Sequence, residues 1–133
     1  VTVVAYFNPD RSWVRDNLAT PRRVLDHEQI HFDLAELSAR QLRREIAEGI
    51  WDSLTYKTKL RNLFQDIRNQ LVQLQKKYDD DTEHGVNYTR QSTWAKNVTD
   101  MIDETVAFSR HTVMIEIQPA LAERQPKDQP TPR

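Results

Sequence analysis

A long stretch without glycine or proline constrains this chain more than any other feature. Neither residue interrupts residues 24–48, and apolar side chains recur there at the three- and four-residue steps of an amphipathic helix. The whole sequence of 133 residues has only 2 glycines, which indicates few tight turns and a largely helical body. The apolar positions of this first predicted helix are Leu25, Phe32, Leu34, Ala35, Leu37, Ala39, Leu42, Ile46 and Ile50.

A second apolar stripe runs from about Leu54 to Tyr78 and predicts a second long helix. Only residues 50–53 separate the two helices, and a short connection between long helices favours an antiparallel hairpin. The alternative is that the stripe forms the seam of a coiled coil with a partner. The members of the stripe are Leu60, Leu63, Phe64, Ile67, Leu71, Leu74 and Tyr78.

The two ends of the chain carry strand signals around a third helix. Val1 to Phe7 is rich in β-branched and aromatic residues, and His111 to Ile117 alternates in part. We therefore predict that these two segments pair as a small terminal β-sheet. A third helix is expected from about Thr89 to Ser109. The predicted fold class is α+β and predominantly helical, with a long antiparallel helical hairpin, a third helix and the small sheet.

Turn signals divide the chain into one domain and a tail. Asn8-Pro9-Asp10 predicts a turn, and Thr20 with Pro21 suits the start of the first helix. Residues 119–133 hold four prolines among polar residues. This composition predicts a mobile tail that follows a single domain at residues 1–118.

Composition excludes several classes of function. The net charge of -1 and the lack of a basic stripe give no basis for nucleic-acid binding. No apolar run is long enough for a transmembrane segment. The chain contains no cysteine, which excludes a thiol nucleophile, a disulfide framework and a zinc site with cysteine ligands.

The most informative chemical motif is His-Glu-Gln-Ile-His at residues 27–31, which reads H-E-x-x-H within the first predicted helix. Residues four apart lie on one helix face, so the imidazoles of His27 and His31 can reach one metal ion. Glu28 projects beside that ion, where its carboxylate can accept a proton from water. The motif predicts a catalytic Zn²⁺ site with Glu28 as general base. The alternative is a solvated helix face that carries two histidines.

A third metal ligand is expected, because catalytic zinc usually has three protein ligands and one open position. In an antiparallel hairpin of two similar helices, the segment after Tyr78 arrives close to the start of the first helix. That segment contains His84, which we predict as the third ligand, and Gly85, which permits a tight bend. The alternative ligands are the carboxylates of Asp79, Asp80, Asp81 and Glu83.

Five further side chains are candidates for supporting roles. The hydroxyl of Tyr78 or Tyr88 can donate a hydrogen bond to the oxyanion of a tetrahedral intermediate, although either ring can instead belong to the core. Asp33, Glu36 and Asp79 are candidates for hydrogen bonding to the metal ligands. For Asp33 and Glu36 the alternatives are a solvated face or an anchor between helices. Glu36 is a poor direct ligand because it lies about 140° around the helix from the second histidine.

Three segments carry a resemblance to a known family. They are H-E-Q-I-H-F-D-L-A-E at residues 27–36, Y-D-D-D-T-E-H-G at residues 78–85 and Q-S-T-W at residues 91–94. Together they resemble the DUF922 family of predicted secreted bacterial zinc-dependent proteases, and residues 7–14 resemble its early segment. The resemblance covers residues 7–98. It implies a zincin-like metallopeptidase fold, a zinc ion and a periplasmic or secreted location.

The expected function is therefore zinc-dependent hydrolysis of peptide bonds in a peptide or protein substrate, with Glu28 as general base. Two alternatives remain. The chain can be a helical interaction or adaptor domain whose zinc is structural or non-catalytic, and a fourth protein ligand would favour that reading. It can also be a metallohydrolase that acts on a non-peptide amide or ester, because the zinc chemistry is shared.

Overall fold

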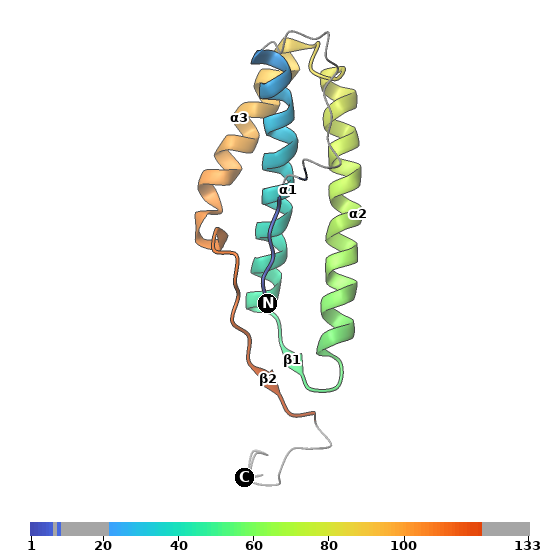
Figure 1. The fold of residues 1–133 in the computed structure, drawn as a ribbon, viewed down its shortest axis with the longest axis vertical. Coiled ribbons are helices and arrows are strands. Elements are labelled where there is room, and N and C mark those ends of the chain that lie inside the picture. Colours follow the sequence, from blue (N-terminus) through green and yellow to red (C-terminus); the bar gives the residue numbers. More distant parts are fainter. Residues whose placement is uncertain (7, 9–21, 121–133) are drawn as a thin grey trace, which may run out of the picture.

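A computed structural model of the protein describes residues 1–6, 8 and 22–120. Three long helices dominate it, and two short strands lie at one end of the molecule (Figure 1). The elements in chain order are α1 (Arg22–Glu48), β1 (Trp51–Asp52), α2 (Tyr56–Thr82), α3 (Tyr88–Glu104), the 3-10 helix η2 (Val106–Phe108) and β2 (Ile117–Gln118).

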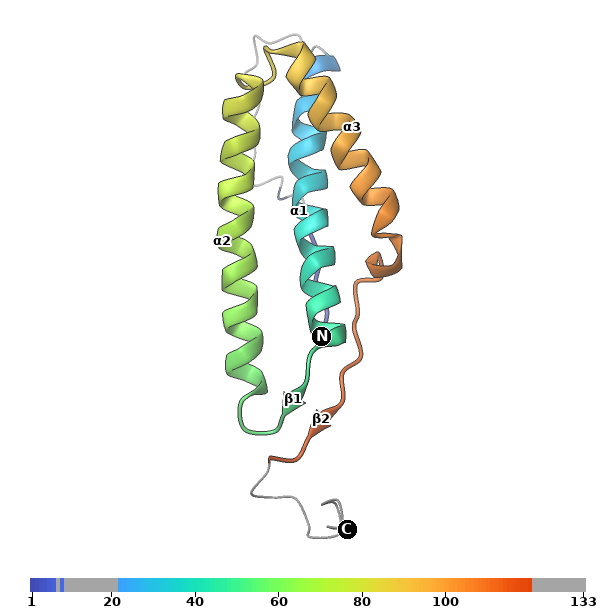
Figure 2. The same cartoon turned by 180° about the vertical axis from the view of Figure 1, so that it is seen from behind.

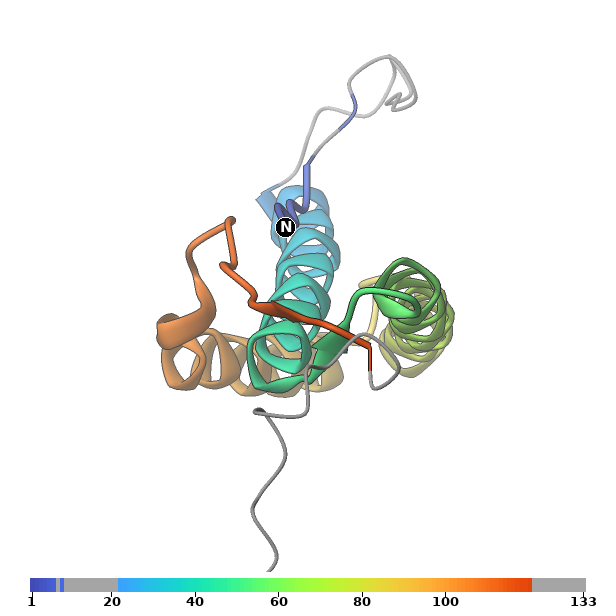
Figure 3. The ribbon, with the colours of Figure 1, turned by 90° about the horizontal axis from the view of Figure 1, so that it is seen from below.

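Helix α1 is the central element of the fold. It runs antiparallel to α2, and α3 packs along its other side (Figures 1 and 2). Seen from the strand end, α1 lies between the other two helices (Figure 3). The predicted helical hairpin and third helix are confirmed. Two ends differ from prediction, because α2 continues to Thr82 and α3 stops at Glu104, where η2 takes over.

The hydrophobic core falls into two clusters along α1. The cluster near the start of α1 contains Ile30, Leu34, Tyr78 and Val98. The cluster near the end of α1 contains Leu42, Ile46, Trp51 and Ile67. Both clusters use the predicted apolar faces of α1 and α2, so the three- and four-residue spacing is explained by burial between helices. No helix among the described residues is long and apolar enough to cross a membrane.

A buried ionic cluster lies on another face of α1. The Arg43 side chain is fully buried, and its Nη1 lies 2.8 Å from Glu36 Oε1. Arg40 Nε lies 2.9 Å from the same oxygen. The remaining Arg43 donors reach the carbonyl oxygens of Val3 and Phe108, so the guanidinium joins α1 to the N-terminal segment and to η2. Glu36 thus holds two arginines that anchor α1 to other elements, and an anchoring role was one of the three considered for it.

The prediction of a sheet made by the two chain ends is confirmed only in part, because these ends meet at a single bridge and the sheet itself uses other residues. The sheet pairs β1 with β2 in parallel, with Trp51 opposite Ile117. The N-terminal segment contributes only an isolated antiparallel bridge between Thr2 and Thr112. The physical reason lies at Val3, whose carbonyl oxygen accepts hydrogen bonds from buried Arg43 at 2.7 and 3.0 Å. That carbonyl is therefore occupied by a side chain and does not join a β-ladder.

Several predicted features fall outside the described residues. They are the turn at Pro9 and Asp10, the helix cap at Thr20 and Pro21, and residues 121–133 of the predicted tail. The first residues of that tail are described. Ala120 is buried, and its backbone N–H donates to Ser53 Oγ at 3.2 Å. The segment that follows β2 is therefore packed against the α1–α2 connection as far as Ala120.

Candidate metal centre

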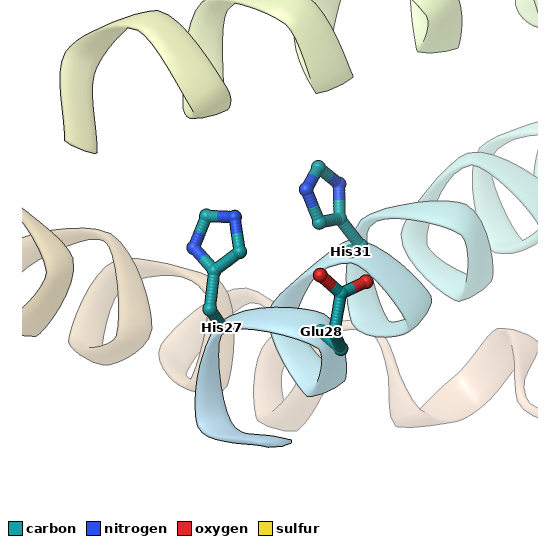
Figure 4. Close-up of side chains that lie close together, drawn as sticks. All are labelled: His27, Glu28 and His31. Carbon is teal, nitrogen blue, oxygen red and sulfur yellow. The ribbon is translucent and has the colours of Figure 1, made fainter. Parts of the chain in front are cut away.

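The H-E-x-x-H motif lies in the first turns of α1, at the end of the molecule opposite the strands (Figure 1). The last turns of α2 and the first turn of α3 meet it there. The side chains of His27 and His31 point from α1 toward α2, and Glu28 lies beside them (Figure 4). Donor atoms of these three residues lie within 4.8 Å of one another. The motif is therefore assembled as the helical spacing predicts.

Asp79 of α2 meets both histidines. Its Oδ1 lies 3.0 Å from His27 Nε2 and 2.7 Å from His31 Nε2. The His27 side chain is 7% exposed, His31 is 21% exposed and Asp79 is 28% exposed. Asp79 was expected in a loop, but α2 extends past it, so the carboxylate is fixed on a helix. A carboxylate oxygen on α2 thus contacts ring nitrogens of both histidines on α1.

The other nitrogen of each imidazole is held by a glutamine. His27 Nδ1 lies 2.9 Å from Gln91 Oε1, and His31 Nδ1 contacts Gln75 Oε1. The amide of Gln75 is oriented by its own Nε2, which donates to the His31 carbonyl oxygen at 2.9 Å. Because the amide oxygens face the rings, each Nδ1 must be the donor. In the neutral form, each imidazole then directs its Nε2 lone pair at Asp79.

Tyr78 completes the support of His27. Its ring stacks on the His27 imidazole with centroids 4.6 Å apart, and its hydroxyl donates to the His27 carbonyl oxygen at 3.0 Å. The same hydroxyl accepts from Gln91 Nε2 at 2.7 Å, which turns Gln91 Oε1 toward His27. Burial raises the pKa of Tyr78 to about 12, so the hydroxyl remains a donor at neutral pH. Tyr78 is fully buried and faces protein partners.

The arrangement of donors fits a metal ion. Two imidazole lone pairs and a carboxylate oxygen repel one another unless a proton or a cation lies between them. Ligand atoms around tetrahedral zinc are about 3.3 Å apart at the usual bond lengths, and the two Nε2–Oδ1 separations here, 3.0 and 2.7 Å, are somewhat shorter. Two nitrogens and one oxygen are also a donor set that zinc uses in catalytic sites.

His84 lies at the edge of this group. Its Nδ1 is 3.8 Å from Asp79 Oδ1, and its side chain is 78% exposed. The residue sits in a left-handed turn, with φ of 50° at Glu83, 55° at His84 and 89° at Gly85. Positive φ is uncommon for residues other than glycine, so this turn is held in an unusual conformation beside the site. His84 as third ligand stays a prediction, and Asp79 is closer to the histidines.

Gly85 is required at its position for two reasons. Its φ of 89° lies in the region that favours glycine. A Cβ at this position would also lie 3.2 Å from the His27 ring. The turn therefore approaches His27 closely, and its Thr82, Asn87 and Gly85 backbone groups are tied by hydrogen bonds into a compact link between α2 and α3.

The other predicted carboxylates face away from the histidines. Asp80 pairs with Lys76 at 2.6 Å, and Asp81 pairs with Lys77 at 2.9 Å. Asp33 accepts a hydrogen bond from Gln29 Nε2, at 2.9 Å, on the exposed side of α1. Glu36 belongs to the ionic cluster with Arg43 and Arg40. Glu83 is exposed and caps the end of α2 through its backbone N–H.

A cleft of about 470 Å³ opens beside the motif. Tyr88, the second tyrosine considered for the oxyanion, lines it, and its ring is half exposed under the Arg23 guanidinium. The complete lining is Arg22, Arg23, Val24, His27, Glu28, His84, Gly85, Val86 and Tyr88. Of the motif residues, His27 and Glu28 line this cleft.

Sequence reasoning missed the two glutamines. Gln91 stands first in the Q-x-x-W segment of the family resemblance, but no role was assigned to it. Gln75 lies four residues before Asp79, so the two share a face of α2 just as His27 and His31 share a face of α1. Polar pairs four residues apart on two antiparallel helices could have indicated that α2 contributes side chains to the site.

The helical hairpin and the two-histidine centre define the class of this protein as a helical domain with an H-E-x-x-H candidate metal site. The model of the DUF922 family, described as bacterial protein of unknown function, matches residues 11–85, more than half of the chain. The chain belongs to the DUF922 family. Searches of curated proteins and of solved structures gave no match.

Proposed function

We propose that this protein is a zinc-dependent hydrolase of peptide bonds with a zincin-like active site. The observation that supports the proposal is the meeting of His27 Nε2, His31 Nε2 and Asp79 Oδ1 beside Glu28. The side chains of His27, His31 and Asp79 would hold the ion. Bound zinc would supply Lewis-acid chemistry, which acidifies water and polarises a carbonyl oxygen. The periplasmic or secreted location implied by the resemblance is part of the same proposal.

Glu28 would act as the general base. It follows His27 directly on α1, is exposed, and lines the cleft through which a substrate would enter. Its carboxylate can accept a proton from the attacking water and return that proton to the leaving amine. Within the described residues, Glu28 forms no ion pair that would divert it from this task.

The two glutamines and Tyr78 would act as positioning residues. Gln75 and Gln91 fix the tautomer of His31 and His27, so the Nε2 lone pairs are preorganised toward one point. Tyr78 holds Gln91 and the His27 backbone at the same time. Hydrogen bonds of this kind orient metal-bound histidines and raise their basicity.

A second candidate function follows from the position of His84. If His84 joins His27, His31 and Asp79, four protein ligands close the site, and a closed tetrahedral site is typical of structural zinc. The 3.8 Å separation between His84 Nδ1 and Asp79 Oδ1 favours this reading. The protein would then be a helical interaction or adaptor domain stabilised by its metal.

Substitution of Glu28 separates the two functions. We expect Glu28→Gln to retain stoichiometric zinc but to hydrolyse a quenched peptide library at least about 100-fold more slowly than the wild type, the usual loss for a general base. The matched control is Glu45→Gln, an exposed glutamate further along α1, which should keep the wild-type rate. Zinc binding without hydrolysis by the wild type would support the structural alternative. Hydrolysis at the wild-type rate by Glu28→Gln would refute the assignment of the base.

A further inference from the structure

The cleft beside the motif has a cationic outer wall. Arg22 and Arg23 form the first turn of α1, and both line the cleft. The Arg23 Cζ lies 3.8 Å from the centroid of the Tyr88 ring, a cation–π contact that holds the guanidinium against the α3 side of the cleft. An arginine stacked in this way keeps the N–H groups at its edge available for an anion.

These two arginines differ from those further along the helix. Arg40, Arg43 and Arg44 all form ion pairs with glutamates of α1. Within residues 1–6, 8 and 22–120, neither Arg22 nor Arg23 has a carboxylate in ion-pair range. Their positive charges are therefore uncompensated by the described chain, at the helix end where the macrodipole also favours negative charge.

The position of the arginines relative to the motif limits where an anion would sit. Arg23 precedes His27 by four residues, which is about 6 Å along the helix axis. An extended peptide advances about 3.3 Å per residue. A carboxylate that contacts Arg23 would thus belong to a residue about two positions from the bond next to Glu28.

We propose that this cleft selects peptides that carry a carboxylate about two residues from the scissile bond, with Arg23 and Arg22 as specificity-determining residues. This inference rests on the proposed peptide hydrolase. The carboxylate can come from an acidic side chain or from the C-terminus of a peptide. Both sources offer the planar anion that a guanidinium binds through two parallel hydrogen bonds.

Peptide binding to the full-length Glu28→Gln protein tests the inference without hydrolysis. The probes are the blocked pentapeptide Ala-Ala-Glu-Ala-Ala, its glutamine counterpart, and penta-alanine with a free C-terminus, measured by calorimetry with and without added zinc. We expect at least one carboxylate peptide to bind about fivefold more tightly than the glutamine peptide, the effect of one partly exposed ion pair. Which of the two binds identifies the source of the carboxylate.

Variants then locate the effect. Arg23→Gln, added to Glu28→Gln, should abolish the preference, and Arg23→Glu should bind a lysine-centred pentapeptide more tightly than the glutamate one. Arg61→Gln, which removes an exposed arginine from α2, should leave the preference intact. Circular dichroism checks that each variant is folded.

The inference is overturned if no carboxylate peptide binds better than the glutamine peptide, if neither binds at all, or if Arg61→Gln weakens the preference as much as Arg23→Gln. The hydrolase proposal has separate tests. A carboxylate preference in a protein that neither binds zinc nor cleaves peptides would leave the cleft assignment standing and remove the enzyme. Cleavage of acidic and neutral peptides at equal rates would support the hydrolase proposal and refute the carboxylate preference.

Discussion

Helix α1 carries two polar clusters that differ in how complete they are. In the cluster of Glu36, Arg40 and Arg43, one carboxylate meets two guanidiniums, and the remaining Arg43 donors reach carbonyl oxygens. In the cluster of His27 and His31 with Asp79, two ring nitrogens and a carboxylate oxygen face one another. The first cluster finds hydrogen-bond partners for its carboxylate and guanidinium groups within the chain. With neutral imidazoles, the second presents only acceptors to one another, and a cation or a proton would balance it.

The two clusters lie on the same helix but have different consequences for the protein. Both clusters join α1 to distant parts of the chain through buried or partly buried charges. A cluster that satisfies itself contributes to stability and has no vacancy for a ligand, whereas a cluster of preorganised acceptors favours a metal. The first should therefore respond to mutation in unfolding measurements, and the second in metal binding.

The largest effect is expected from Arg43→Met, which breaks the self-contained cluster. Glu36 would keep only Arg40 as a cationic partner, and the carbonyl oxygens of Val3 and Phe108 would lose their donor. Removal of one member of a buried ion pair typically costs about 3–5 kcal/mol. Urea denaturation should show this loss in the free energy of unfolding.

The matched control for that measurement is Arg44→Met, next to Arg43 in the same helix. Arg44 pairs with Glu48 on the surface, and its side chain is 60% exposed. We expect this change to cost no more than about 0.5 kcal/mol. Equal losses for Arg43→Met and Arg44→Met would contradict the view that the inner cluster anchors the fold.

An intermediate effect is expected from Gln91→Leu, which acts on the acceptor cluster. The change removes the oxygen that holds the His27 Nδ1 proton and frees the imidazole to change tautomer. Loss of such a hydrogen bond typically lowers metal affinity about 10- to 100-fold. Competition with a zinc-sensitive dye measures the affinity, and Gln73→Leu on the exposed side of α2 is the control. Unchanged affinity in Gln91→Leu would mean that the glutamine does not position His27.

A smaller effect on the free energy of unfolding is expected when the pH is lowered. Desolvation by burial raises the pKa of Glu36, but the hydrogen bonds and positive charges of Arg43 and Arg40 outweigh it and lower that pKa below the ordinary 4.5. The stabilisation is therefore complete above about pH 4.5 and is lost as the pH falls through the lowered value. The free energy of unfolding can be measured by urea denaturation between about pH 6 and about pH 3. Over this range it should fall more steeply for the wild type than for Glu36→Gln. Parallel curves for the two proteins would contradict the assignment.

Much of this architecture could be predicted from sequence because local periodicity carries it. The stripes from Leu25 to Ile46 and from Leu60 to Tyr78 identified both helices of the hairpin, and the hairpin brought the segment after Tyr78 to the motif. Helix spacing alone placed His27 and His31 on one face. These features depend on residues three and four apart, so a single sequence contains them.

The rest depends on contacts between distant residues. The β-branched run at Val1 looked like a strand, but Arg43, far along the chain, takes the carbonyl of Val3. The end of α2 was placed too early, because the acidic run after Tyr78 looked like a loop. That run is helical, since Asp80 and Asp81 pair with lysines one turn earlier. Because α2 continues past Tyr78, Asp79 lies on the helix and contacts the histidines, in addition to the turn that contains His84.

The most direct test of the central claim is zinc binding to the purified protein after dialysis, measured by elemental analysis and by competition with a chelator. The wild type should hold a stoichiometric zinc ion, His27→Ala and Asp79→Ala should each lose it, and His111→Ala, an exposed histidine near the opposite end, should retain it. A wild type that binds no zinc, or a His27→Ala protein that binds it as tightly as the wild type, would contradict the account.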